Sequence, residues 1–264
     1  ILFLAILYSI ISDSKNLYLK IIAGGLVLGG MIATNSWDFA SYALAAGITF
    51  FIASAVKKKE FFPSLIASVV KTLSMAALGF ISFLPFILNF SPIAEGIKFV
   101  HSQTPLWQLG VLWGFPAAMT VLFLFFIFKF LKGKLKPPDG FVLAILAASW
   151  ILVFIPEMVF VKDIYIASHY RANTMFKLTY QAYIMFYLSA GYVAIRLLGR
   201  LQKVWRLIGV GFFSLLFTSL LIYPFLAVNS YYGGLKNFQG LSGETWVEKF
   251  YPESYRAILW LREN

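Results

Sequence analysis

One short stretch of this sequence holds most of the side chains that could do chemistry. Residues 156–177, PEMVFVKDIYIASHYRANTMFK, lie between two long apolar runs and carry both signs of charge. Arg171 offers a bidentate fork and Lys177 a point charge, so together they could bind a phosphate. Glu157 or Asp163 would then act as a general base or hold a divalent cation, Mg²⁺ or Mn²⁺, which prefers oxygen ligands. The alternative is that these carboxylates only form salt bridges with basic neighbours and hold the loop together.

A polar stripe runs from this stretch into the apolar run that follows it. Asn173, Lys177 and Gln181 are spaced i, i+4, i+8, which places them on one face of a helix. Lys177 alone could extend its ammonium group to the membrane surface. That reading does not explain two amide side chains on the same face. The spacing therefore favours a lined cavity.

A second polar group, Asn-Ser-Trp-Asp at residues 35–38, separates two other apolar runs. An Asp before an apolar run is a good N-cap, so capping alone competes with a catalytic or ligand-contacting role for Asp38. Trp37 could be an interfacial anchor, and Asn35 is a further polar candidate. His101 and His169 have no second His or Cys at ligand spacing, so we predict no zinc site.

The composition places these groups in a membrane protein. Hydrophobic residues make up 60% of the chain and charged residues 12%, against roughly 25% charged in a typical soluble domain. The mean hydropathy is +0.80. A net charge of +11 could suggest nucleic acid, but basic loops in a membrane protein are first a topology signal, so no nucleic-acid partner is expected. The absence of cysteine excludes disulfides and thiolate metal sites.

The apolar runs predict an all-α polytopic membrane protein with about eight transmembrane helices, the first of them truncated. Residues 1–227 would form the transmembrane domain, and residues 228–264 the start of a small outward-facing extramembrane segment. The chain opens inside an apolar run, so we expect it to be the C-terminal part of a larger bundle. The predicted spans are residues 1–11, 19–34, 39–56, 64–88, 107–131, 140–160, 174–196 and 206–227.

Every second connection between these spans is basic. By the positive-inside rule, such connections face the cytoplasm. The short connections that carry the candidate site residues then face outward. The basic residues are Lys57, Lys58, Lys59, Lys129, Lys132, Lys134, Lys136, Arg196, Arg200, Lys203 and Arg206.

Three separated motifs resemble those of one bacterial and archaeal family of multi-span proteins, the DUF2298 or YYY membrane protein family. They are TNSWDFASY at residues 34–42, E…KDIYIASHYRANTMFKLTYQAY at 157–183, and the tail LSGETW…YPESYRAILWL. The family is similar to the GT-C superfamily of integral membrane glycosyltransferases. That resemblance implies a GT-C-like fold in the plasma membrane of a bacterium or archaeon. It also implies a polyprenyl-phosphate-linked sugar donor, membrane lipid and an unidentified acceptor as partners at the outer face.

The motifs carry the family's functional positions onto this chain. The resemblance gives catalytic roles to Asp38, Glu157 and Asp163, and donor or phosphate binding to Asn35, Trp37, Arg171, Asn173, Lys177 and Gln181. Two positions depart from the pattern, with Ala40 in place of a proline and Ser242 in place of an aspartate. The second departure weakens a catalytic role for the tail. The main catalytic carboxylate of GT-C enzymes lies in their first outer loop, which would precede Ile1. A transporter and a non-catalytic lipid-binding envelope scaffold are the rival functions.

Overall fold

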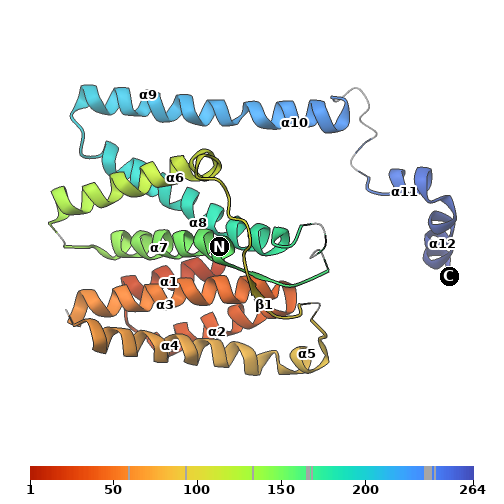
Figure 1. Cartoon of the computed structure of the whole chain (residues 1–264), viewed down its shortest axis with the longest axis horizontal. Coiled ribbons are helices and arrows are strands. Elements are labelled where there is room, and N and C mark those ends of the chain that lie inside the picture. The colour runs from red at the N-terminus through yellow and green to blue at the C-terminus, as the bar shows by residue number, and fades with distance from the viewer. Residues whose placement is uncertain are drawn as a thin grey trace. The chain divides into compact units, whose positions relative to one another are not determined.

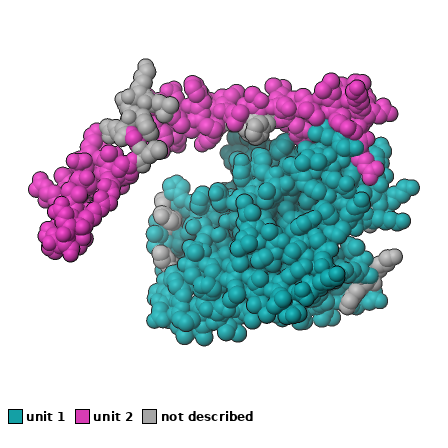
Figure 2. All heavy atoms as spheres, turned by 180° about the vertical axis from the view of Figure 1, so that it is seen from behind, with its two compact units in different colours: residues 1–199 teal, residues 200–264 magenta. Residues whose placement is uncertain are grey.

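The computed structural model describes residues 1–264 except residues 59, 93, 133, 165, 166, 168, 235–239 and 241. The side chains of Lys58, Phe217 and Leu220 are also outside the description. Lys59 of the predicted basic set and part of the predicted segment 228–264 therefore lie outside the described residues. The chain divides into two compact units, residues 1–199 and 200–264, coloured separately in Figure 2.

The first unit is helical, as Figure 1 shows. The prediction of an all-α polytopic membrane protein is confirmed, because six helices among the described residues are long and apolar enough to cross a membrane. They are α2, α3, α4, α6 (continued by η1), α7 and α8; α1 is apolar but shorter. The elements are α1 (Leu2–Ser12), α2 (Leu17–Thr34), α3 (Ser36–Lys58), α4 (Phe61–Ser82), α5 (Leu84–Asn89), β1 (Ile97–Phe99), α6 (Leu106–Phe126), the π-helical η1 (Ile127–Leu131), α7 (Pro137–Met158), β2 (Val159–Val161) and α8 (Ala172–Leu198).

Proline divides two of the predicted spans. The run predicted at residues 64–88 forms α4 and α5, which meet at Phe83, two residues before Pro85. The run predicted at 206–227 forms α9 (Lys203–Leu220) and α10 (Ile222–Tyr232), which meet at Leu221 before Pro224. Proline has no N–H to donate and clashes with the preceding turn, so each helix is interrupted there. A total of eight spans stays a prediction.

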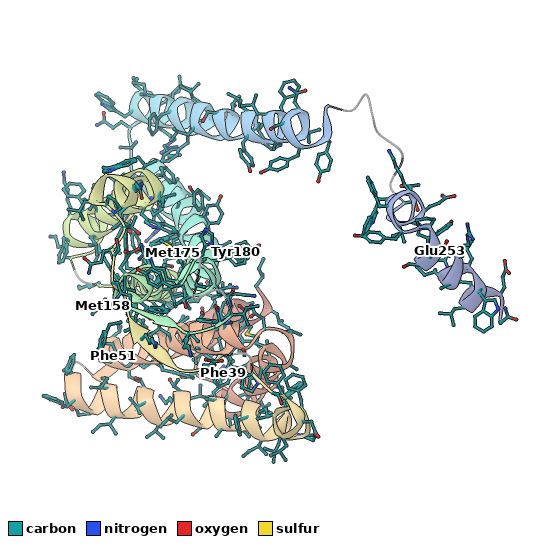
Figure 3. All side chains as sticks on the ribbon, turned by 45° about the vertical axis from the view of Figure 1, so that its right-hand side comes forward. Phe39, Phe51, Met158, Met175, Tyr180 and Glu253 are labelled. Atoms are coloured by element: carbon teal, nitrogen blue, oxygen red, sulfur yellow. The ribbon has the colours of Figure 1, made fainter. Side chains whose placement is uncertain are left out.

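The helices of the first unit pack in a continuous series. Helices α2, α3 and α4 pack on one another, α1 and α3 pack against α7, and α7 packs on α8, which also contacts α6 (Figure 1). Large side chains fill the centre of this series, including Phe50, Phe123 and Phe186, each of which is almost fully buried. Figure 3 shows the side chains on these helices.

Buried hydroxyl groups within the helices are satisfied by their own helix. Ser41, Thr49, Ser149 and Ser189 each donate to the carbonyl four residues earlier, at 2.7 to 2.9 Å. A polar group facing hydrocarbon has no water to bond, so this local bond removes most of the cost of its burial. These residues can therefore lie in apolar helices without a functional role.

Two of the basic connections meet at one end of the first unit. The Lys57 ammonium donates to the Ser14 hydroxyl at 3.2 Å, and Asp139 pairs with Arg196. This end, called the basic end below, lies toward the left of the unit in Figure 1, and strands β1 and β2 lie toward the right. The position of these basic connections at one end of the unit agrees with the alternation of basic connections in the sequence. Which membrane face each end occupies stays a prediction.

The second unit is a set of helices ending in a small hairpin. Helices α9 and α10 are followed by α11 (Thr245–Phe250) and α12 (Pro252–Glu263). Trp246 packs edge-on against Tyr251, and Glu244 pairs with Arg262. The predicted division of the chain at residue 228 stays a prediction.

Glycines let α2 and α4 approach closely. A Cβ built on Gly29 would lie 2.4 Å from the Gly79 carbonyl oxygen, and one on Gly79 would lie 2.7 Å from the Gly25 carbonyl oxygen. Side chains at these positions would force the helices apart. Small residues at helix contacts are typical of membrane bundles, where close van der Waals packing drives association.

We predict that Gly29→Ala destabilises the bundle by about 1–3 kcal/mol, because the new methyl group has no space against α4. Unfolding in a sodium dodecyl sulfate titration, followed by circular dichroism, measures this loss. Gly30→Ala is the matched control, since a Cβ there meets only the Phe83 ring at 3.7 Å, an ordinary contact. Equal stability of the two variants would contradict the close-packing argument.

Candidate functional site

The loops after α5 and α7 are joined by a two-stranded ribbon. β1 pairs antiparallel with β2, with Lys98 opposite Phe160. Beyond the strands, the Glu95 amide donates to the Lys162 carbonyl and the Lys162 amide to the Gly96 carbonyl, both at 2.8 Å. The all-α prediction did not include this ribbon. It defines the ribbon end of the first unit, opposite the basic end.

A buried carboxylate connects three segments at the ribbon end. Glu157, 7% exposed, accepts hydrogen bonds from the Thr104 amide at 2.8 Å and the Thr104 hydroxyl at 2.7 Å. The Arg171 guanidinium pairs with Glu157 at 2.8 Å and also donates to the Pro156 carbonyl and the Thr104 hydroxyl. This Glu157 cluster fixes the starts of α6 and α8 to the end of α7. Of the two alternatives that the sequence offered for Glu157, the structure shows the salt bridge, with Arg171 as the partner.

The polar stripe of α8 connects two further carboxylates. The Asn173 amide donates to Asp163 at 2.9 Å, and the Gln181 amide donates to Asp38 at 2.8 Å. Gln181 in turn accepts from the Tyr42 hydroxyl at 2.9 Å, so its amide group is bonded at both atoms. The i, i+4, i+8 spacing thus places Lys177 between two amide–carboxylate pairs.

Asp38 lies in the first turn of α3, and both of its recorded side-chain partners are amides. Asn35 and Gln181 each donate to the same oxygen, Oδ1, at 2.8 Å. In the part of the chain that the structure describes, no donor is recorded for the other oxygen, Oδ2, and no backbone amide of α3 is recorded on this carboxylate. The amides hold the carboxylate in place and leave one oxygen available to accept a proton.

A cavity of about 330 Å³ opens beside this stripe. Lys177 reaches it from α8 and Trp37 from α3, while Asp163 and Asn173 form another part of its wall. Within the described residues, Lys177 has no carboxylate within ion-pairing distance, and the centre of the Phe176 ring lies 6.0 Å from its ammonium. The remaining lining residues of this ribbon-end cavity are Ser36, Phe90, Pro92, Ala94, Val161 and Ile164.

The predicted site residues therefore separate into two groups. In one group, Trp37, Asp163, Asn173 and Lys177 line the ribbon-end cavity, while Asn35, Asp38 and Gln181 bond to one another without lining it. The other is the Glu157 cluster, whose carboxylate and guanidinium bond each other and do not line the cavity. Arg171 and Lys177, expected to bind one phosphate together, are not brought together at this cavity. Trp37 lines the cavity, and its role in binding stays a prediction.

The donor set gives little support for a metal centre. Asp38 and Asp163 each already accept amide hydrogen bonds. Within the described ranges, no three His, Asp or Glu side chains gather where they could hold a metal ion. The divalent cation expected from the sequence stays a prediction.

Sequence reasoning missed two partners of this site. Tyr42 follows Asp38 by four residues, so helical spacing could have placed it on the same face. Thr104 lies in a separate loop, 53 residues before Glu157, and no local pattern marks it. It becomes a partner only because the ribbon joins the two loops.

A second buried carboxylate lies at the basic end. Asp139 is fully buried and accepts from the Tyr192 hydroxyl at 2.7 Å and from the Arg196 guanidinium at 3.0 and 3.1 Å. This Asp139 cluster connects the start of α7 to the last turns of α8. These hydrogen bonds and the positive charge of Arg196 compensate the negative charge of Asp139, as a buried carboxylate requires.

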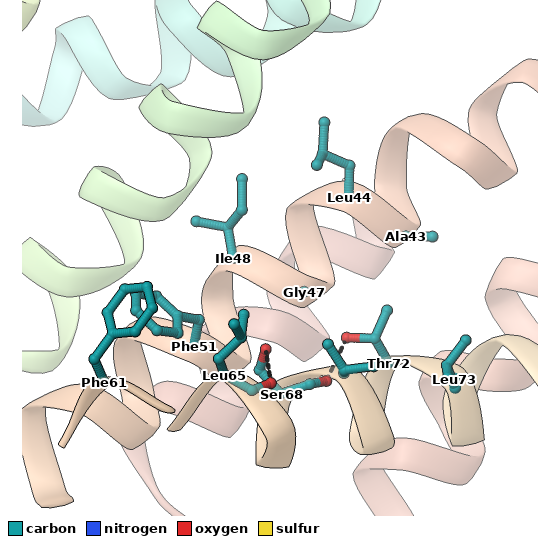
Figure 4. A pocket seen from close by; sticks show the side chains of 11 residues that line it. Ala43, Leu44, Gly47, Ile48, Phe51, Phe61, Leu65, Ser68, Thr72 and Leu73 are labelled. Atoms are coloured by element: carbon teal, nitrogen blue, oxygen red, sulfur yellow. Dashed lines mark hydrogen bonds between the residues drawn. The ribbon is translucent and has the colours of Figure 1, made fainter. Parts of the chain in front are cut away.

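Two apolar grooves follow the membrane-spanning helices. The one drawn in Figure 4, about 550 Å³ between α3 and α4, includes Ile48, Phe51 and Leu65. The hydroxyls of Ser68 and Thr72 in its wall donate to carbonyls of their own helix, so this groove offers no free polar group. A second groove of about 510 Å³ lies between α6 and α8, and its wall includes Trp113, Met175 and Tyr180, the last two labelled in Figure 3.

A family model described as "Uncharacterized membrane protein (DUF2298)" matches residues 1–134 and 124–186. The matched residues include the first two of the three sequence motifs and the whole ribbon-end cavity. No curated protein and no solved structure matches this chain.

We predict that Arg171→Gln costs about 2–4 kcal/mol of stability, because it leaves the buried Glu157 carboxylate without its charge partner. Chemical or thermal unfolding of the purified protein measures this. Lys162→Gln is the matched control: it removes an exposed ion pair with Glu95 and should change stability little. Adding Glu157→Gln to Arg171→Gln should recover part of the loss. A stability of Arg171→Gln equal to that of the control would contradict the structural role of the Glu157 cluster.

The ribbon should weaken in acid. The hydrogen bond and charge of Lys162 lower the pKa of Glu95 from its ordinary value of 4.5. A carboxylate with a lowered folded-state pKa stabilises the structure fully above its ordinary pKa, and this contribution is lost as the pH falls through the lowered value. Hydrogen-exchange protection of the amides of residues 96–100, corrected for intrinsic rates, should therefore fall below about pH 4.5. Glu95→Gln should abolish that pH dependence, and an unchanged profile in this variant would refute the assignment.

Proposed function

The chain belongs to the DUF2298 family of uncharacterized membrane proteins, and we propose that it is a membrane glycosyltransferase acting at its ribbon end. The donor would be a sugar linked to polyprenyl phosphate. The observation that carries the proposal is the position of Lys177, which lies on α8 between the residues of two amide–carboxylate pairs and lines a cavity of about 330 Å³. The motif resemblance to GT-C enzymes supplies the reaction class.

Lys177 supplies the positive charge for the donor phosphate. Its ammonium has three N–H donors, and its side chain is half-buried at the cavity wall. When the bond between sugar and phosphate breaks, negative charge grows on the departing polyprenyl phosphate. A fixed cation at this place stabilises that charge more in the transition state than in the ground state.

The α6–α8 groove suits the hydrocarbon chain of the donor. It is lined by Trp113, Phe176 and Tyr180, among other apolar residues. Phe176 belongs to this groove and its ring centre lies 6.0 Å from the Lys177 ammonium, so neighbouring residues on the same turns of α8 line the groove and the ribbon-end cavity. A lipid-linked donor would keep its chain in the groove and its phosphate at Lys177.

Asp38 is the proposed base. Its Oδ1 atom is held by Asn35 and Gln181, and its Oδ2 atom would take the proton of the acceptor hydroxyl. The acceptor oxygen forms a bond to the anomeric carbon of the sugar, and polyprenyl phosphate departs with the electron pair of the broken C–O bond. Trp37 offers an apolar ring face with an N–H donor to the sugar, and Asp163, fixed by Asn173, would orient the acceptor.

Glu157 and Arg171 take a different role from the one that the motifs suggested. Because they are bonded to each other and to Thr104, we assign them to positioning: they fix the loop that carries Asp163 and the first turn of α8. The positive-inside rule would place the ribbon end on the outer face of the plasma membrane, where polyprenyl-phosphate sugars are used by the enzymes that the motifs resemble.

We predict that the protein in nanodiscs transfers sugar from at least one polyprenyl-phosphate donor to a component of a cell-envelope extract. Lys177→Ala should lower kcat about 100- to 1,000-fold, as expected for loss of an electrostatic stabiliser. Asp38→Asn should lower it about 100-fold or more, because the amide keeps an oxygen for both hydrogen bonds but cannot take the proton. Sugar transfer and release of polyprenyl phosphate are the two measured products.

Lys98→Ala is the matched control, since Lys98 is an exposed lysine on β1 that does not line the cavity. It should keep full activity, and all variants should elute as single species in size-exclusion chromatography. Transfer unaffected by either site variant would refute the assignment of the site. No transfer from any intact donor would favour a transporter, and retention of donor without release of its phosphate would favour a lipid-binding scaffold.

A further inference from the structure

A small cavity at the basic end has no part in the proposed reaction. It lies where α1, α3 and the start of α7 meet, and its volume is about 110 Å³. This equals the space of roughly three to four water molecules, which suits a phosphate group. Lys57 and Lys136 line it, together with apolar side chains that include Ile52, Val56 and Leu135.

Both lysines keep N–H groups available for an anion. Lys57 donates to the Ser14 hydroxyl at 3.2 Å, a neutral partner that occupies one of its three donors. Within the described residues, no carboxylate lies within ion-pairing distance of the ammonium group of Lys57 or Lys136. The nearest buried acid, Asp139, is occupied by Tyr192 and Arg196. The cavity therefore presents two positive charges with no acid to neutralise them.

The surroundings make the same end strongly positive. The connections there carry Lys15, Lys129, Lys132 and Lys134 besides the two lining lysines, against the acidic residues Asp13, Glu60 and Asp139, the last of which pairs with Arg196. Lys57 is the last residue of the membrane-spanning segment Ser36–Lys57, and Ile52 and Val56 lie on the last turns of that segment. The lining thus changes from charged to apolar along the direction that enters the membrane.

We propose that this cavity binds the phosphate of an anionic phospholipid from the leaflet at the basic end, the cytoplasmic one by the positive-inside rule. Lys57 and Lys136 bind the phosphate, and the apolar side chains contact the first part of an acyl chain. Basic pockets between transmembrane helices on this side of a membrane favour anionic headgroups. A soluble phosphate would satisfy the lysines but would leave the apolar wall without a partner. This proposal does not depend on the glycosyltransferase reaction.

Native mass spectrometry of the detergent-purified protein tests the proposal. The protein is titrated with phosphatidylglycerol and, separately, with phosphatidylcholine of the same acyl chains. We expect retention of one phosphatidylglycerol in preference to phosphatidylcholine. Each lysine near an anionic group contributes about fivefold, so the double variant Lys57→Gln/Lys136→Gln should weaken phosphatidylglycerol binding roughly 20-fold.

The control is Lys15→Gln/Lys132→Gln, which removes the same charge at the same end from residues that do not line the cavity. It should bind phosphatidylglycerol nearly as well as the unaltered protein, and Lys57→Arg/Lys136→Arg should also bind it. Equal weakening in the control would show a diffuse charge effect and overturn the site. Equal retention of phosphatidylglycerol and phosphatidylcholine would also overturn the site. Competition by inorganic phosphate at the concentration of the lipid would overturn the lipid assignment in favour of a soluble phosphate.

Discussion

Helices α7 and α8 are joined at both ends by a buried carboxylate paired with an arginine. Asp139 pairs with Arg196 at the basic end, and Glu157 pairs with Arg171 at the ribbon end. An unpaired carboxylate at either place would be costly, so each pair fixes both the separation and the register of the two helices. The rest of the first unit depends on that register. It sets which residues of α8 face α3, and therefore where Gln181 meets Asp38.

The ribbon-end cavity follows from the same constraint. Once α8 is fixed on α7, its stripe presents an amide to Asp163, a lysine to the cavity and an amide to Asp38. Each of the two amides donates a neutral hydrogen bond to one of the two carboxylates, and among the described residues no carboxylate lies within ion-pairing distance of Lys177. Asp38 also keeps one carboxylate oxygen, Oδ2, with no hydrogen-bond donor among the described residues. One cation beside one fixed base is a minimal arrangement for transfer of a group from a phosphate ester.

The two ends of the first unit use their basic residues differently. At the ribbon end, Arg171 is bonded to its carboxylate and Lys162 to Glu95, so Lys177 carries the charge of the cavity. At the basic end, lysines outnumber acids, and Arg196 alone satisfies the buried acid with a charge. A sequence scan counts all of these residues equally. Only their partners distinguish a structural cation from one that can bind an anion.

The sequence by itself determined the class of the protein and the positions of most membrane-crossing helices, because burial in lipid demands long apolar runs that composition reveals directly. It also determined the stripe of Asn173, Lys177 and Gln181, because helical spacing is local. The tertiary structure alone decided which partners these residues contact. The pairing of Glu157 with Thr104 and of Gln181 with Asp38 joins segments 53 and 143 residues apart, which no local pattern can encode. For the same reason, only the fold separated Arg171 from Lys177: a nearby carboxylate satisfies the first, and the second lies at a cavity.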